Sequence, residues 1–226
     1  KFISYQKDNI KAIGVLLKDE QKIVNLKELS LSRNFLNIIE LINTLTEEDL
    51  DKIEKTSYLL THPKAISIKE VRVCAPIEKP IHDLICVGVN YHDHLQETQE
   101  SFDKNFEKPQ HSVYFSKRVV RAIGPQDEID GHLQIDSCLD YEVELGVIIG
   151  KTGINIPKEK AEDYIFGYTI INDISARSLQ KQHVQWYRGK SLDTFTAMGP
   201  VILHKKDLPF PIEVNLCSRV NGEIRQ

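Results

Sequence analysis

The sequence of 226 residues lacks any apolar run long enough to cross a bilayer. Its longest such runs, for example Leu145 to Ile149, fall far short of the roughly 20 residues that a membrane helix needs. Tandem repeats, low-complexity tracts and a charged-then-apolar opening segment are also missing, so we expect a globular protein of the cytoplasm. Lysine and arginine are scattered and the formal net charge is −4, which argues against nucleic-acid binding. A small molecule is therefore the expected partner.

Paired cysteines are lacking too. The four cysteines, Cys74, Cys86, Cys138 and Cys217, lie far apart, and neither a CxxC pair nor a histidine at zinc-finger spacing accompanies them. We expect them to be small buried side chains, as free cysteine often is.

The sequence does have an ordinary globular composition, with 41% hydrophobic and 27% charged residues. That is enough to bury a real core in one large domain or in a small and a medium one.

Residues 1–70 show the pattern of a small accessory domain. Three short segments alternate or run apolar between turn residues and predict a meander of strands at 2–5, 12–17 and 22–26. Residues 34–45 repeat apolar side chains at helical spacing, and Thr46 begins a second helix as a cap before an acidic first turn. This part contains no constellation that looks chemical.

Residues 71–226 predict a second, strand-rich domain, after an extended segment around Pro76. Its first strand is the apolar run 84–89, and polar residues cluster directly after it. Further strands are expected where Val, Ile, Tyr and Phe gather, at 113–116, 141–149, 168–172 and 200–204. One clear short helix is indicated at 157–165. Helices are too few for regular βαβ alternation, so we predict a mostly β, α+β architecture with a mixed sheet rather than a Rossmann fold or a TIM barrel.

Two carboxylates, Glu142 and Glu144, stand at i and i+2 inside an apolar strand segment. Strand side chains alternate between faces, so both carboxylates should point the same way while Val143, Leu145 and Val147 pack on the other face. Two like charges in a partly buried site stay ionised only if a cation compensates them. The spacing alone leaves open a solvated strand edge.

Asp173 strengthens the interpretation as a metal site. It ends another apolar strand segment, 168–172, and so repeats the arrangement of an acidic residue at the end of a buried strand. Three oxygen ligands without a thiolate or imidazole suit Mg²⁺, Mn²⁺ or Ca²⁺ better than Zn²⁺. We therefore predict a divalent cation on Glu142, Glu144 and Asp173, with coordination positions left for water or substrate.

Two further segments suggest catalytic groups. His94 and Glu97 lie at i and i+3 where a helix is expected to begin, and a carboxylate bonded to one imidazole nitrogen makes the other a better base. A surface pair is the alternative for them. Lys190 lies in a Gly-Lys-Ser segment, but the upstream glycine of a phosphate loop is replaced by Val184, so that interpretation fails. Lys190 is then either a solvent-facing lysine or a cation facing the bound substrate.

Six segments match one known family in order and approximate spacing: 85–94, 113–117, 140–145, 167–177, 189–194 and 220–226. Through them the chain resembles the fumarylacetoacetate hydrolase family, and within it the bacterial members that process 2-oxo acids. Residues 1–70 are similar to that family's variable N-terminal domain. The resemblance implies a mixed β-roll catalytic domain, usually a homodimer, with Mg²⁺ or Mn²⁺ on Glu142, Glu144 and Asp173.

The resemblance also implies roles for single residues. It assigns the general-base dyad to His94 and Glu97, and it places in or around the substrate pocket Lys190, Arg177, Gln180, Lys117 and Tyr91. Family members continue past the position of Gln226 with a stretch that completes the roll and carries a Thr-Gly-Thr-Pro substrate-binding turn. We therefore expect the C-terminal part of the roll to be missing from this sequence.

The reactions of the family share an enolate next to a carboxylate, whose charge a chelating divalent ion spreads. The resemblance implies a metal-dependent enzyme for small 2-oxo or 1,3-dioxo acids, and C–C bond hydrolysis of acylpyruvate or fumarylacetoacetate type is the first expectation. The alternatives are an oxaloacetate-type decarboxylase or a 2-hydroxyhepta-2,4-diene-1,7-dioate isomerase, and a non-catalytic protein that retains the fold. The hydrolase and the decarboxylase or isomerase would use the same site residues, so the sequence does not separate these two classes of enzyme.

Overall fold

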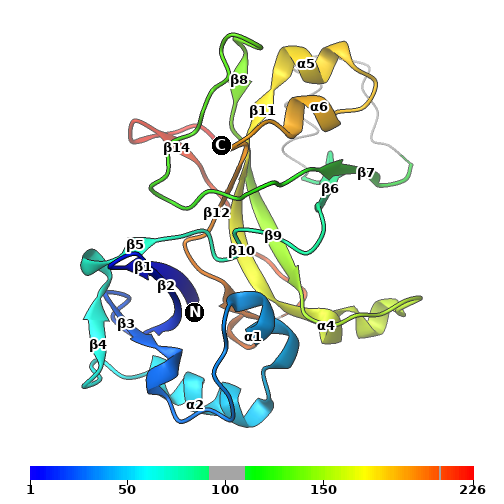
Figure 1. Ribbon diagram of the computed structural model, residues 1–226. Helices are drawn as coiled ribbons and strands as arrows, with labels where there is room; N and C mark the ends of the chain where they lie inside the picture. Colours follow the sequence, from blue (N-terminus) through cyan, green and yellow to red (C-terminus); the bar gives the residue numbers. More distant parts are fainter. Residues whose placement is uncertain (92–109, 209) are drawn as a thin grey trace.

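The computed structural model describes residues 1–91, 110–208 and 210–226 (Figure 1). The fold is mixed α+β and strand-rich, and a long curled pair of strands runs through the middle of the molecule (Figure 1). This pair consists of β9 (Val143–Ile149) and β10 (Ile165–Asp173). The fold class predicted from the sequence is confirmed. In the described part of the chain, no helix is long and apolar enough to cross a membrane.

The N-terminal part contains a five-stranded antiparallel sheet in the order β4-β3-β2-β1-β5. Its strands are β1 (Phe2–Lys7), β2 (Ile10–Leu16), β3 (Lys22–Asn25), β4 (Ala65–Ser67) and β5 (Arg72–Val73). Asp8 and Asn9 join β1 to β2 with φ of 48° and 62°, the left-handed values of a tight two-residue hairpin turn. The predicted meander is therefore present, with two additional short strands.

Two helices cover one side of this sheet, α1 (Ile38–Thr44) and α2 (Glu47–Ser57) (Figure 1). The Thr46 side chain accepts the Asp49 N–H, which confirms the predicted cap of α2. The expected start of the first helix at residue 34 is wrong. Asn37 accepts the Glu40 N–H and so caps α1 three residues later, because the backbone at Asn37 is extended rather than helical.

The second part builds several small sheets around β9 and β10. β10 pairs with β9, β12 and β13, while the remaining strands form the pairs β6–β7, β8–β11 and β14–β15. These strands are β6 (Leu84–Gly88), β7 (Val113–Lys117), β8 (Leu139–Asp140), β11 (Ser175–Ala176), β12 (Thr196–Met198), β13 (Leu203–His204), β14 (Arg219–Val220) and β15 (Glu223–Ile224). The short helices are α4 (Ala161–Tyr164), α5 (Arg177–Gln182) and α6 (Tyr187–Lys190). Single 3₁₀ turns are η1 (Leu26–Glu28), η2 (Ile68–Glu70), η3 (Lys158–Lys160) and η4 (Lys205–Asp207).

The two parts share one apolar core. Phe2 and Ile202 exchange backbone hydrogen bonds of 2.8 and 2.9 Å, and both are buried in a cluster that also contains Phe166 and Ile171 of β10. This contact holds the first strand of the chain against the sheet that carries the acidic residues. The predicted boundary near residue 70 stays a prediction, since the buried cluster includes residues from both sides of it.

Two expectations about burial are wrong in part. Cys74 is buried and Cys86 half-buried, but Cys138 and Cys217 are exposed, because both lie in irregular segments outside the apolar clusters. The apolar face of β9 is also not fully packed: Val143 and Leu145 are half-buried, and Val147 is 47% exposed.

A buried imidazole at the junction of the two parts makes stability depend on pH. His204 is 8% exposed, lies against the rings of Phe2 and Phe166, and accepts the Lys206 N–H. Burial lowers the pKa of His204 from 6.5 to about 4, and Lys205 and Lys206 add to this while Asp207 and Glu47 oppose it.

Between pH 6.5 and about 4, the unfolded chain should therefore bind a proton that the folded chain excludes. As the pH is lowered through this window, the free energy of unfolding should decrease by about 3 kcal/mol in total because of His204. Urea unfolding of the wild type and of His204→Gln at several pH values checks this, since the variant should show a smaller loss between pH 7 and pH 4.5. Equal losses in the two proteins would contradict it.

Candidate active site

The three predicted metal ligands lie on one face of the β9–β10 pair. Val143 is opposite Asn172 and Glu144 is opposite Ile171, and the Asp173 N–H donates to the Glu142 carbonyl at 2.8 Å. Residues directly opposite each other in an antiparallel pair point to the same face, as do residues two apart on one strand. Glu142, Glu144 and Asp173 therefore share a face, which the alternation had predicted for Glu142 and Glu144.

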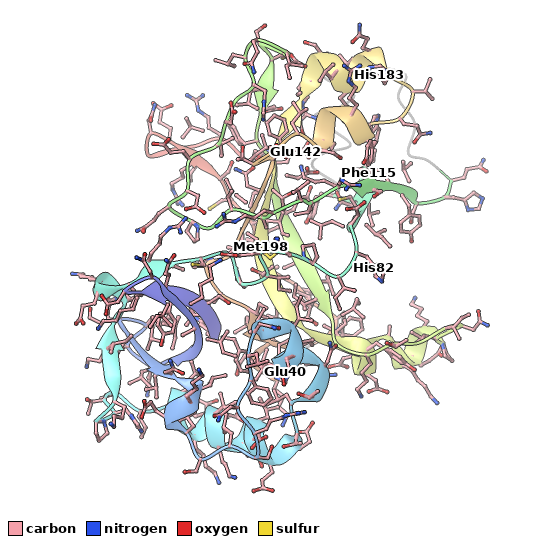
Figure 2. All side chains as sticks on the ribbon, viewed as in Figure 1. Glu40, His82, Phe115, Glu142, His183 and Met198 are labelled. Carbon is pink, nitrogen blue, oxygen red and sulfur yellow. The ribbon has the colours of Figure 1, made fainter. Side chains whose placement is uncertain are left out.

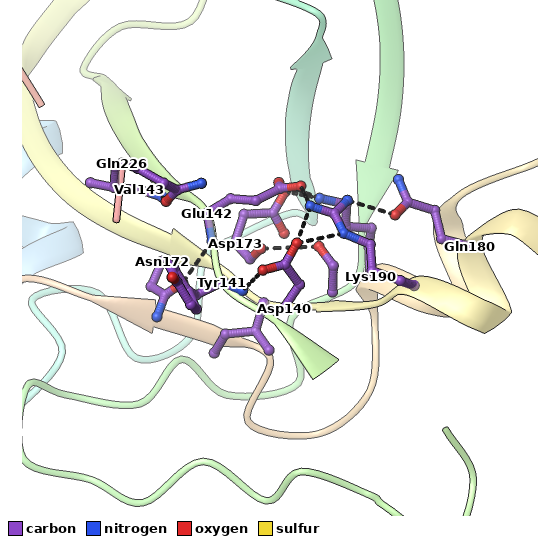
Figure 3. A network of polar contacts seen from close by, with 12 residues as sticks. Asp140, Tyr141, Glu142, Val143, Asn172, Asp173, Gln180, Lys190 and Gln226 are labelled. Carbon is purple, nitrogen blue, oxygen red and sulfur yellow. Dashed lines mark hydrogen bonds and ion pairs between the residues drawn. The ribbon is translucent and has the colours of Figure 1, made fainter. Parts of the chain in front are cut away.

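Lys190 places a buried ammonium group between two of these carboxylates (Figure 3). Its side chain is 2% exposed, and its Nζ lies 2.5 Å from Glu142 Oε2 and 2.8 Å from Asp173 Oδ2. Gly189, directly before Lys190, has to be glycine. A Cβ at this position would lie 2.7 Å from the backbone nitrogen of Gln180 and hold α6 away from α5. The alternative that Lys190 faces solvent is wrong.

A second buried lysine binds the other oxygen of Asp173. Lys117, at the end of β7, is 1% exposed and donates to Asp173 Oδ1 at 2.5 Å and to the Ile174 carbonyl at 3.0 Å. Burial lowers the pKa of Lys117, and the attraction of Asp173 opposes this without reversing it. Burial alone would raise the pKa of Asp173, but Lys117 and Lys190 outweigh it and hold that pKa below its ordinary value.

Arg177 closes the cluster on the side of Glu142. Its Nη2 lies 2.7 Å from Glu142 Oε1 and 2.7 Å from Asp140 Oδ2, and its Nε also donates to Asp140 Oδ2 at 2.8 Å. Its Nη1 donates to Gln180 Oε1 at 2.8 Å. The guanidinium group is thus bound mainly to acidic side chains of the protein.

Glu144 lies on the other side of Glu142, beside the segment that follows β6. Asn90 Nδ2 donates to Glu144 Oε2 at 3.4 Å, and the Leu145 N–H donates to the Tyr91 hydroxyl at 3.4 Å. Burial raises the pKa of Glu144, and the charges of Glu142 and Asp173 add to this. Val89, directly before Asn90, has a φ of 52°, a strained value for a β-branched residue that re-aims the chain where it leaves the strand.

The acidic cluster lies at the end of the sheet that is distant from the N-terminal part. In Figure 2, Glu142 and Phe115 lie at that end, and Met198 lies between them and the N-terminal sheet. The Lys190 Nζ is 5.6 Å from the centre of the Phe115 ring. This apolar neighbour helps to keep water from the ammonium group and strengthens its ion pairs.

The structure gathers most of the predicted site residues around this cluster. Those that it describes near one another are Glu142, Glu144, Asp173, Lys190, Lys117, Arg177, Gln180 and Tyr91. His94 and Glu97 lie outside the described residues, so the base dyad stays a prediction.

The carboxylates match the chemistry of a divalent cation but do not close around a common point. Among the described residues, no three Asp, Glu, His or Cys side chains form a group that could hold one ion. Glu142 and Asp173 meet at the Lys190 ammonium, whereas Glu144 is bonded to Asn90. Three carboxylates on one face still offer the oxygen ligands that Mg²⁺ and Mn²⁺ prefer. The three predicted ligands therefore suit a divalent cation in their chemistry and lie on the same face. The metal site itself stays a prediction.

Asp140, Cys86 and Asn90, the partner of Glu144, belong to the site but were not among the residues predicted from the sequence. Asp140 binds Arg177, and Cys86 lies in β6 beside the carboxylates, where burial raises its pKa to about 12 and keeps it a neutral thiol. Asp140 directly precedes the segment 141–149, which is the only local signal. Its partner Arg177 is distant in sequence and becomes visible only once β8 pairs with β11.

Comparison with known proteins shows the family of this chain. Residues 83–226 match the family described as fumarylacetoacetate (FAA) hydrolase C-terminal. The oxaloacetate tautomerase YisK of Bacillus subtilis is 48% identical over 160 residues, which cover 71% of this chain and 52% of that protein. The chain thus spans about half the length of this curated relative.

Two solved structures show the same fold. A fumarylacetoacetate hydrolase from Exiguobacterium antarcticum has a TM-score of 0.77 and 36% identity, and the match covers 100% of this chain and 74% of that one. A 5-carboxymethyl-2-hydroxymuconate delta-isomerase from Mycobacterium smegmatis has a TM-score of 0.69 and 26% identity, with the same coverage. Since the family match takes in both acidic strands and both buried lysines, the chain belongs to the fumarylacetoacetate hydrolase family.

Proposed function

We propose that this protein interconverts the keto and enol forms of a small 2-oxo dicarboxylic acid of oxaloacetate type. The observation that carries the proposal is the buried cluster of ion pairs, in which Lys190 and Lys117 lie against Glu142 and Asp173 with Arg177 beside them. The similarity to an oxaloacetate tautomerase supports this choice of reaction, and the similarity to a delta-isomerase supports the same class of proton transfer.

The reaction breaks a C–H bond next to the carbonyl carbon, whose proton the predicted base His94 with Glu97 would take, and makes an O–H bond at the carbonyl oxygen, without adding water. Negative charge develops on that oxygen, and fixed cations in a site of low dielectric stabilise it. Lys190 Nζ suits this role, because it lies against Glu142 and Asp173 inside the site and an ammonium group has protons to give to the oxygen. A divalent cation on Glu142, Glu144 and Asp173 would supply further stabilisation of the same charge.

C–C bond hydrolysis is the second candidate, and the 36% identity to a fumarylacetoacetate hydrolase favours it. It needs the same stabilised enolate as a leaving group, together with a base that makes hydroxide from water. The predicted base is His94 with Glu97. The homodimer, the cytoplasmic location and the identity of the metal ion are proposals as well.

The experiment that tests the proposal measures three reactions separately, each in the presence of Mg²⁺, of Mn²⁺ and of excess chelator. Tautomerisation is followed by the loss of enol absorbance of oxaloacetate, decarboxylation by CO₂ release, and hydrolysis by pyruvate release from acylpyruvates. We expect metal-stimulated tautomerisation above the buffer rate. Pyruvate release from acylpyruvate without accelerated tautomerisation would replace the proposal with the hydrolase, and no turnover in any assay would favour a non-catalytic protein.

A further inference from the structure

We propose that Asp140 is a positioning residue of this site, which holds the Arg177 guanidinium so that only one of its nitrogens engages Glu142. The inference rests on the proposed function in one respect, since Glu142 is taken as a working residue of the site. Asp140 is not among the residues to which a catalytic, substrate-binding or metal-binding role was given above.

The geometry of the guanidinium group motivates the proposal. Nε and Nη2, the pair of nitrogens that makes side-on bidentate contacts, both lie on Asp140 Oδ2, at 2.8 and 2.7 Å. Arg177 makes a single contact with Glu142, from Nη2 to Oε1 at 2.7 Å. The other oxygen of Glu142, Oε2, is thereby left to Lys190.

Asp140 is itself fixed by the local backbone. It pairs with Ser175 across β8 and β11, and its Oδ1 accepts the Tyr141 N–H at 2.9 Å. The Arg177 N–H donates to the Cys138 carbonyl at 2.8 Å, so the backbone holds both partners in register. The Asp140 side chain is 39% exposed and that of Glu142 is 11% exposed. Asp140 therefore keeps its charge in contact with water while it binds the arginine that faces the buried carboxylate.

Removing this charge should change what Arg177 does. Without the Asp140 carboxylate, the Nε and Nη2 pair is free to bind both oxygens of Glu142 and to compete with Lys190 for Oε2. Glu142 would then carry less uncompensated charge for a cation, and Lys190 would lose one of its two carboxylates. Asp140 thus limits how far Arg177 neutralises Glu142.

A double-mutant cycle tests the inference through Mn²⁺ binding, measured by calorimetry or electron paramagnetic resonance. Asp140→Asn should weaken Mn²⁺ binding by about tenfold, within the usual coupling of contacting residues. In an Arg177→Met background the same substitution should change binding by less than about twofold, because Asp140 acts through Arg177. Asp163→Asn, at an exposed position of α4, is the matched control and should leave binding unchanged.

Kinetics and folding provide the second readout. In Asp140→Asn, KM for the substrate should rise more than kcat falls, whereas a merely structural defect would lower the thermal midpoint and the active fraction together. An equal loss of Mn²⁺ binding in both backgrounds, or no loss in either, would overturn the inference. Absence of Mn²⁺ binding by the wild type would overturn it too, whatever the assays show. If the cycle behaves as expected while no substrate is turned over, the inference stands and the proposed function fails.

Discussion

Lys190→Met is expected to lower turnover of the preferred substrate at least a hundredfold and to destabilise the fold. The substitution removes the proposed proton donor, and a positioned acid usually accelerates a reaction about 10²- to 10⁴-fold. It also leaves Glu142 and Asp173 without the ammonium group that they share. Removing one partner of a buried pair costs about 3 kcal/mol at the lower end, the value to expect here because Lys117 and Arg177 remain.

Steady-state kinetics and urea unfolding measure the two effects. The matched control is Lys206→Met, since Lys206 pairs with Glu47 on the surface, with both side chains well exposed. Exposed pairs contribute about 0 to 1 kcal/mol, so the control should be close to wild type in both assays. If Lys190→Met behaved like Lys206→Met, the buried cluster would have no part in the reaction.

Glu142→Gln is expected to abolish both the cation binding and the turnover of the protein. The amide keeps the size of the side chain but removes the charge that Lys190, Arg177 and a divalent cation would share. We expect turnover to fall about a thousandfold or below detection, comparable with the loss of a main electrostatic contact in other enzymes. Tautomerisation and hydrolysis should fall together, because both pass through the same stabilised enolate.

Mn²⁺ titration and product assays on the same preparation check this expectation. Glu159→Gln, at an exposed position of η3, controls for the loss of a carboxylate as such. A Glu142→Gln protein that bound Mn²⁺ normally but was inactive would place the carboxylate on the substrate instead of the metal ion. Normal Mn²⁺ binding together with normal turnover would show that Glu142 takes no part in metal binding or in the reaction.

Strand periodicity was enough to predict the shared face of Glu142 and Glu144, because alternation is a local property of the chain. Asp173 lies on a second strand, and it shares this face because the register of β9 and β10 brings its backbone onto Glu142. That it binds a metal ion stays a prediction. The partners of these carboxylates were less accessible. That Lys117 and Lys190 bind the two oxygens of Asp173 depends on β7 and α6, whose positions no local pattern encodes.

The failures have similar physical causes. The helices α5 and α6 are too short for a periodic apolar stripe, so they were not predicted, although α6 decides that Lys190 is buried. Asn37 was counted within a helix because its neighbours have helical spacing, whereas its side chain serves better as a cap. The exposure of Cys138 and Cys217 reflects loops whose surroundings depend on distant segments.

The pairing of Phe2 with Ile202 has a consequence for the order in which the protein folds. During synthesis the first strand leaves the ribosome long before Ile202, so this pairing has to wait for almost all of the described chain. Contacts between such distant positions require the closure of a very long loop and form slowly. Until then, the side of Phe2 that packs against Phe166 has no partner, and we expect the nascent chain to be more prone to aggregation in this interval.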